Sequence, residues 1–94
     1  MNINILYFPL IPEADVMEKV YINTEYIKLQ QALKLANIVG SGSDAKLMIQ
    51  EGFVYVNGQL CKMRGKKLRN GDKVKVSGEI VERDYEFVIA YHEN

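Results

Sequence analysis

The chain has 94 residues, of which 48% are hydrophobic and 26% are charged, and its formal net charge is zero. This composition excludes wholesale disorder, and the length predicts one domain with a modest core. Cys61 is the single cysteine, which excludes an internal disulfide and a cysteine-based zinc site. The sequence has no apolar run of the roughly 18–20 residues that span a membrane, and its apolar start lacks a signal-peptide pattern. We therefore expect a cytoplasmic protein.

Charge is distributed unevenly along this neutral chain. Residues 26–78 contain ten Lys and Arg against three acids, whereas residues 1–25 and 79–94 together hold nine acids against two basic residues. Five of the cations fall within residues 62–69. Because charges are screened beyond a Debye length of roughly 8–10 Å, a ligand responds to the local patch rather than to the total. The cluster is either a solvated face or, as we expect, the binding surface for a polyanion.

Residues 1–16 differ from the rest of the chain. They are mostly apolar and contain both prolines, Pro9 and Pro12. Two interpretations are open: an appended tail before an alternative start at Met17, or an extra edge strand, since proline is tolerated at sheet edges and strand ends. We assign residues 17–94 to a single domain with an acidic C-terminal strand.

The first predicted elements are a short strand and a helix. Residues 20–22 favour a strand, and Thr24 is placed to cap the element that follows. Apolar residues then recur at helical spacing, which predicts a helix over residues 26–39. Its apolar stripe contains Leu29, Leu33 and Ala36.

A second, shorter helix is predicted after the glycine-rich break at residues 40–42. Ser43 is its expected N-cap, and Asp44 lies in its first turn, where the helix dipole favours an acid. Lys46 lies on its polar face. Gly52 is expected to end this helix in the left-handed conformation.

The second half of the domain is predicted to be β-structure. Residues 53–56 alternate in hydrophobicity, and Asn57-Gly58 predicts a tight hairpin because both central residues of a type I′ turn need positive φ. The elements expected to follow are a return strand at 59–61, a turn at 70–72 and strands at 73–76 and 84–91. This order predicts an α+β domain in which two short helices pack on a small, mainly antiparallel sheet of four to five strands.

Four stretches of the chain resemble a known family. They are IKL at 27–29, SGSDAK at 41–46, IQEGFVYVNG at 49–58 and LRNGDKV at 68–74. Together they resemble the ribosomal-protein-S-four domain, also called the αL RNA-binding motif, over about residues 20–78. The resemblance implies that the second helix and the following hairpin bind structured RNA, either ribosomal or transfer RNA, without catalysis. The small stand-alone bacterial members imply a role at the ribosome or in its assembly.

One position departs from the family pattern. Many members carry Arg directly after the serine that matches Ser41, where this chain has Gly42. A phosphate contact made by that Arg would pass here to Lys34, Lys46 or the loop at residues 64–69. The departure argues against transferring a specific RNA target to this chain.

The basic residues predict an interface independently of the resemblance. If the lysines of both helices converge with the loop cations, their face suits the phosphates and 2′-hydroxyls of A-form RNA, whose major groove is too narrow for side chains. Arginine grips phosphate at two points, lysine acts as a point charge, and amides near Ser43 add an anion site. The candidate RNA-binding residues are Lys28, Lys34, Ser41, Ser43, Lys46, Tyr55, Asn57, Lys62, Arg64, Lys66, Lys67 and Arg69.

Some candidates also have a structural interpretation. Tyr55 either stacks on an unpaired base or packs against a neighbouring strand, and packing is favoured for Phe53. Asn57 is first a turn former, Asp72 is expected to support its turn, and His92 is expected to be a surface residue. The sequence holds no nucleophile–base pair and no complete phosphate-loop motif, so we predict no catalytic residue, cofactor or metal.

Other function classes remain open. An exposed sheet edge, formed by residues 1–16 or the strand at 84–91, could serve protein interaction or dimerisation. DNA binding is compatible with the charge. An enzyme is disfavoured, because the chain leaves no room for a catalytic domain beside the RNA-binding one.

Overall fold

Nine helices and strands make up the part of the chain that the computed structural model describes, which covers residues 18–79, 81 and 83–93. In chain order they are β1 (Glu18–Ile22), β2 (Ile27–Lys28), α3 (Leu29–Leu35), α4 (Gly42–Gln50), β3 (Val54–Val56), β4 (Gln59–Leu60), β5 (Lys67–Leu68), β6 (Lys73–Val76) and β7 (Tyr85–Tyr91). Neither of these two helices is long and apolar enough to cross a membrane. Both interpretations of residues 1–16 fall outside the described residues and stay predictions.

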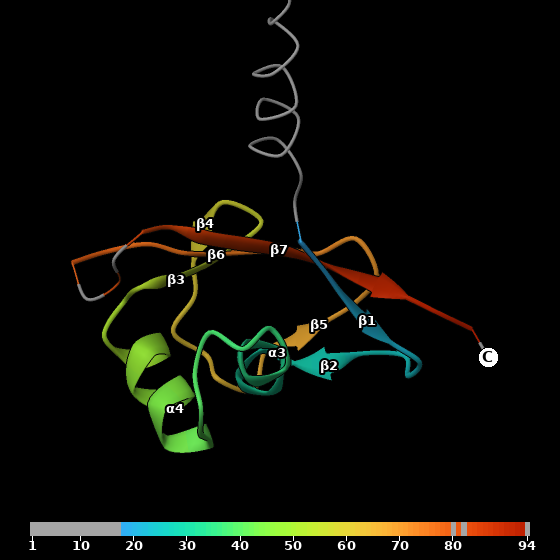
Figure 1. Ribbon diagram of the computed structural model, residues 1–94, viewed down its shortest axis with the longest axis horizontal. Helices are drawn as coiled ribbons and strands as arrows, with labels where there is room; N and C mark the ends of the chain where they lie inside the picture. The colour runs from blue at the N-terminus through green and yellow to red at the C-terminus, as the bar shows by residue number, and fades with distance from the viewer. Residues whose placement is uncertain (1–17, 80, 82, 94) are drawn as a thin grey trace, which may run out of the picture.

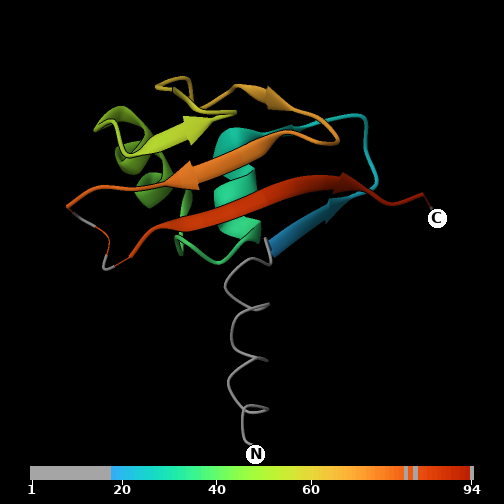
Figure 2. The ribbon, with the colours of Figure 1, turned by 90° about the horizontal axis from the view of Figure 1, so that it is seen from above.

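The main sheet has five strands in the order β1-β7-β6-β3-β4. Its pairs are antiparallel except for β1 and β7, which run parallel with Val20 opposite Ile89. Both helices lie on one side of this sheet in Figure 1, and β1 lies alongside β7 in Figure 2. Two helices with a mainly antiparallel sheet confirm the predicted α+β class. The parallel pair was not predicted, because the direction of a non-neighbouring strand leaves no local signal.

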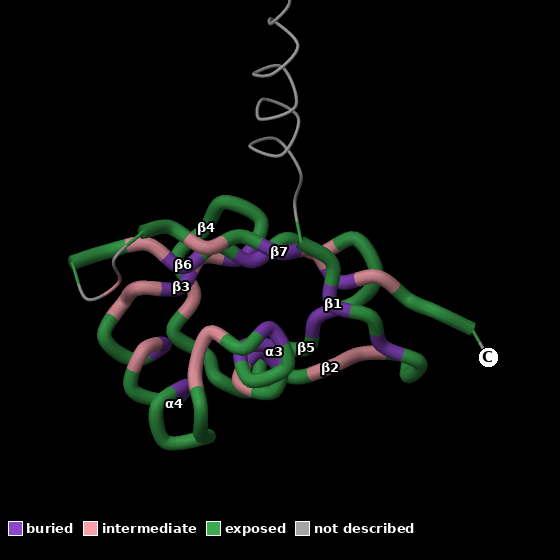
Figure 3. The backbone as a smooth tube through the Cα atoms, viewed as in Figure 1, coloured by how far each residue is buried: buried purple, intermediate pink, exposed green. Residues whose placement is uncertain are grey.

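The core lies between the sheet and the helices because alternate strand residues are apolar. In β6 the side chains of Val74 and Val76 are buried while Lys73 and Lys75 are exposed, as the alternation predicted. Figure 3 shows buried segments in the strands of the sheet and in α3, the two layers that enclose the core. The largest fully buried side chains are Phe87, Leu29, Leu33, Ile49, Leu68, Ile89, Val54, Val74 and Val76.

The turns follow the predicted backbone chemistry. Asn57 and Gly58 have φ of 51° and 85°, as a type I′ hairpin requires, and they connect β3 to β4. Gly52 has φ of 88° directly after the C-cap of α4, which confirms the predicted left-handed end. The side chain of Asp72 accepts a hydrogen bond from the Arg69 amide at 2.8 Å and so supports its turn, as expected.

The first predicted helix is wrong at both ends. Residues 27 and 28 form β2, which pairs antiparallel with β5, and α3 ends before Asn37, whose φ is 62°. Thr24 does not cap the helix, because its hydroxyl donates to the Tyr26 carbonyl at 2.8 Å. Apolar periodicity cannot separate a short strand from a helix that follows it without a break, and this ambiguity extended the predicted helix.

The second helix begins two residues earlier than predicted. Ser41, with φ of −148°, is the N-cap, and its Oγ accepts a hydrogen bond from the Asp44 amide at 3.2 Å. Ser43 therefore lies inside the first turn of α4 rather than at its cap. Ser41 and Ser43 are both suitable N-cap residues, so the sequence alone did not decide between them. Asp44 lies in the first turn, as predicted.

Candidate nucleic-acid interface

The loop between β4 and β5 is tied to the start of α3 by backbone hydrogen bonds. The Leu29 amide donates to the Lys66 carbonyl at 2.8 Å, and the Gln30 amide donates to the Arg64 carbonyl at 3.1 Å. Amides in the first turn of a helix have no partner within the helix, and Lys28 supplies no side-chain cap. The loop backbone caps α3 instead, so this contact holds the basic loop against the helix.

Three cations from separate parts of the chain line one cavity of about 350 Å³. Lys34 comes from α3, Lys46 from α4 and Arg64 from the tied loop. The remaining lining residues are uncharged: Gln30, Gln31, Gly42 and Ser43. We call this cavity the cationic cleft. It has the charge that an anionic ligand requires, since no carboxylate is among the described residues that line it.

The first turn of α4 forms one wall of the cationic cleft. Gly42 and Ser43 lie in this turn, where backbone amides point away from the helix and attract anions. The Ser41 hydroxyl already accepts a hydrogen bond from the helix, so its acceptor role is structural. Asp44 in the same turn lowers the positive potential there. The lysines and Arg64 therefore provide most of the attraction.

A second group of cations surrounds Tyr26. The Nζ atom of Lys67 lies 4.8 Å from the centre of the Tyr26 ring, and the Cζ atom of Arg69 lies 5.6 Å from it. Both distances are within the range of cation–π attraction. The β2–β5 register also places Lys28 directly opposite Lys67. Like charges directly opposite each other on paired strands are destabilising. The repulsion between Lys28 and Lys67 is therefore present in this fold, and the Tyr26 ring and solvent offset it.

Sequence reasoning missed the contribution of Tyr26. It was interpreted as the first residue of a helix, whereas it precedes β2 and organises two of the candidate cations. A tyrosine two positions before a lysine, as Tyr26 stands before Lys28, is not a distinctive sequence pattern. The β2–β5 pairing is the information that would have identified it, and that pairing joins residues far apart in the chain.

The other candidates lie apart from the cationic cleft. Tyr55 faces Lys75 across the β3–β6 ladder and lines a separate hollow with Lys73 and Glu86. The Asn57 side chain is engaged in the structure: its Nδ2 donates to Asp72, and its Oδ1 accepts from the Lys73 amide. Lys62 and Lys66 line a third hollow, near Leu60, Cys61 and Met63.

Within residues 18–79, 81 and 83–93, the ion pair that the structure shows joins Lys75 to Asp84, at 3.6 Å. It involves none of the twelve candidate residues. The same part of the chain holds no group of three or more His, Cys, Asp or Glu side chains placed to bind a metal ion. The candidate residues therefore offer positive charge, amide groups and one aromatic ring.

Comparison with known proteins identifies the class to which this fold and surface belong. Residues 20–82 match the S4 domain family, and the chain belongs to that family. A protein of Bacillus subtilis (strain 168) named "Probable ribosome maturation protein RlbA" is 46% identical to this chain over 57 residues. The aligned part covers 61% of this chain and 80% of that relative. The S4 match ends before β7, so the parallel β1–β7 pair is completed by a strand outside the matched residues.

Proposed function

We propose that this chain is a non-catalytic RNA-binding protein that docks structured RNA on one surface. This surface is formed by the cationic cleft and by the Tyr26 group, which consists of Tyr26, Lys28, Lys67 and Arg69. Ribosomal RNA is the proposed target, and ribosome maturation in the bacterial cytoplasm is the proposed setting. The name of the Bacillus subtilis relative and membership of the S4 domain family support this assignment.

The observation that carries the proposal is the convergence of Lys34, Lys46 and Arg64 on one cavity that no described carboxylate lines. These residues come from two helices and a loop, and backbone hydrogen bonds from α3 fix the loop in place. Successive phosphates of an A-form backbone require several cations at fixed separations. A loop that is already held in place supplies them without the entropy cost of ordering a long segment when RNA binds.

Binding is proposed to be mainly to the backbone. The residues of the cationic cleft are lysines, one arginine and amides, which suit phosphates and 2′-hydroxyls. Arg64 can hold one phosphate by two parallel hydrogen bonds, whereas Lys34 and Lys46 contribute charge with less directional demand. Affinity would then depend on RNA shape more than on base sequence.

Salt dependence tests this proposal directly. Some four to six phosphate contacts should give a slope of roughly −3 to −5 when the logarithm of the association constant for duplex RNA is plotted against that of salt concentration. Fluorescence anisotropy with a labelled RNA hairpin measures it. A slope near zero contradicts the proposal, and competition with a DNA duplex of the same sequence tests the preference for RNA.

The alternative role in protein interaction depends on an available sheet edge. The main sheet ends in β1 on one side and in the two-residue β4 on the other. The prediction that the C-terminal strand offers a sheet edge is wrong, because β7 is paired with β1 on one side and with β6 on the other. Size-exclusion chromatography of the whole chain against a variant beginning at Met17 tests that role. A shift from dimer to monomer would support it, and identical monomeric elution would oppose it.

A further inference from the structure

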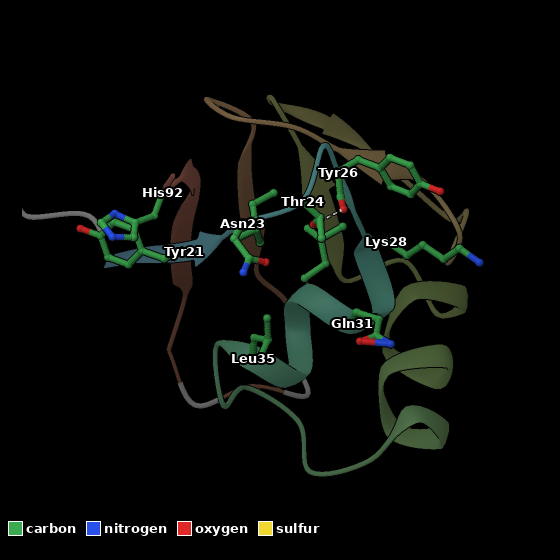
Figure 4. Close-up of a pocket in the computed structure, with 10 residues that line it drawn as sticks. Tyr21, Asn23, Thr24, Tyr26, Lys28, Gln31, Leu35 and His92 are labelled. Atoms are coloured by element: carbon green, nitrogen blue, oxygen red, sulfur yellow. Dashed lines mark hydrogen bonds between the residues drawn. The ribbon is translucent and has the colours of Figure 1, made fainter. Parts of the chain in front are cut away.

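Another cavity, distinct from those described above and of about 660 Å³, opens beside the proposed RNA surface. It lies where β1 ends, where the chain turns into β2, and along one side of α3. Figure 4 shows Tyr21 and His92 at one end of it, Tyr26, Lys28 and Gln31 at the other, and Asn23, Thr24 and Leu35 between. The residues that line it are Tyr21, Ile22, Asn23, Thr24, Tyr26, Ile27, Lys28, Gln31, Leu35 and His92.

The lining of this cavity combines apolar surface with neutral polar groups. Tyr21 and Leu35 are large apolar residues that remain 60% and 57% exposed. The Tyr21 ring packs edge-on against the His92 ring, with 6.0 Å between the ring centroids. Asn23 and Gln31 carry side-chain amides, which both donate and accept hydrogen bonds. No acidic side chain is among these lining residues, so an anionic ligand meets no like charge there.

The cavity is continuous with the proposed RNA surface. Gln31 lines both this cavity and the cationic cleft. Lys28, at the same end of the cavity as Gln31, faces Lys67 across the β2–β5 ladder, and Lys67 lies over the Tyr26 ring. A nucleic-acid backbone that occupies the cleft therefore passes directly beside the cavity.

We propose that this cavity takes up a short unpaired stretch of the RNA that the cationic cleft binds, an inference that rests on the proposed function. The Tyr21 ring offers a face on which a base can stack, and the amides of Asn23 and Gln31 can hydrogen-bond the edge of a base that has left its pair. Lys28 lies at the end of the cavity away from Tyr21, where a backbone phosphate of the same unpaired stretch would be.

Size and charge favour a nucleotide over the other occupant, an apolar segment of a partner protein. The volume is within the roughly 300–1,000 Å³ typical of small-ligand sites. The end of the cavity that holds Gln31 and Lys28 is open toward cations, which a purely apolar partner segment does not require. The site thereby adds recognition of a bulge or loop to a surface that otherwise senses only backbone shape.

The test compares two RNA hairpins that differ by a short bulge of unpaired nucleotides, one of which is replaced by the fluorescent base 2-aminopurine. The wild-type chain should bind the bulged hairpin at least about fivefold more tightly than the fully paired one, as expected for one stacked base. Its binding should also quench the 2-aminopurine fluorescence. Replacing Tyr21→Thr should remove both effects while leaving affinity for the paired hairpin unchanged, because threonine suits an exposed strand position.

Tyr91→Thr is the matched control, since Tyr91 is 49% exposed, lies on the neighbouring strand and does not line the cavity. Leu35→Ala, which preserves helix propensity, is a second variant, with Leu47→Ala in α4 as its control. Both cavity variants should reduce the preference for the bulge, and both controls should retain it.

The outcomes separate this inference from the proposed function. Tight binding of both hairpins with no preference in the wild-type chain overturns the nucleotide site and leaves the proposed function standing. Failure to bind either hairpin overturns both. A bulge preference that survives in the Tyr21 and Leu35 variants also overturns the site, and a protein partner is then the occupant to pursue.

Discussion

Lysines lie on both sides of the main sheet, on the strands of its open face and on the helices that cover the other face, but their neighbours differ. On the open face, Lys75 lies opposite Glu86 in the β6–β7 register and pairs with Asp84 at 3.6 Å. On the side that the helices cover, Lys34 and Lys46 line a cleft with Arg64 and uncharged residues. Lys75 thus has acids beside it, whereas the cleft concentrates positive charge.

This difference teaches that the arrangement of charge, more than its amount, distinguishes a binding surface in a neutral chain. An exposed ion pair such as Lys75–Asp84 contributes roughly 0–1 kcal/mol and leaves little local potential. Cations that share a cleft raise the local potential and attract a polyanion. We therefore expect the basic residues at 26–78 to differ in role according to the face on which they lie.

The largest effect is expected when three positive charges are removed from one side of the sheet or from the other. The triple replacement Lys34→Ala, Lys46→Ala and Arg64→Ala should weaken binding to duplex RNA roughly hundredfold at about 0.15 M salt, at about 1 kcal/mol for each lost contact. The salt slope should fall by about 3, measured by anisotropy. The control, which changes net charge equally, is the open-face triple Lys19→Ala, Lys73→Ala and Lys75→Ala. Equal losses in both triples would mean that total charge governs binding.

Asn57 tests whether a candidate residue has a structural role instead of an RNA contact, because its side chain is hydrogen-bonded within the protein. The replacement Asn57→Gly keeps the positive φ but removes the hydrogen bonds to Asp72 and to the Lys73 amide. We expect a loss of about 1 kcal/mol in the free energy of unfolding, with the midpoint of thermal unfolding lower by roughly 4–8 °C. RNA affinity should change little. An unchanged midpoint with weakened RNA binding would reassign Asn57 as a contact residue.

The smallest expected effect concerns the like-charge pair of the β2–β5 ladder. The replacement Lys28→Glu puts opposite charges at this pair and an acid at the start of α3, so it should raise the free energy of unfolding by about 0.5–1 kcal/mol. It should also weaken RNA binding. Thermal unfolding and anisotropy measure the two effects, with Lys19→Glu on β1 as the control. A variant that is no more stable than wild type would show that the Lys28–Lys67 repulsion is negligible.

The features predicted correctly from the sequence have local signals. The hairpin at Asn57 and Gly58 and the end of α4 at Gly52 depend on backbone conformations that particular residues favour. The alternation of Lys73 to Val76 fixed the buried face of β6. Each of these can be read within a few residues, without knowledge of the rest of the chain.

The features that were missed depend on contacts between distant segments. The β2–β5 ladder joins Ile27 to Leu68 with only two residues in each strand, so neither strand has a recognisable pattern of its own. For the site, Lys34 and Lys46 could be assigned to polar helix faces. That Arg64 lines the same cavity, and that Tyr26 lies under Lys67 and Arg69, follows from how the loop docks on α3.

The parallel β1–β7 pair has a consequence for how the protein is made. β7 lies between β1 and β6, so in the described sheet β1 has no neighbour until β7 has been synthesised. Val20 and Ile22, which are buried in the finished fold, therefore lack the strand that pairs with β1 until then. Such long-range pairing slows folding and prolongs the exposure of apolar surface. The main sheet therefore cannot close until translation has passed residue 91.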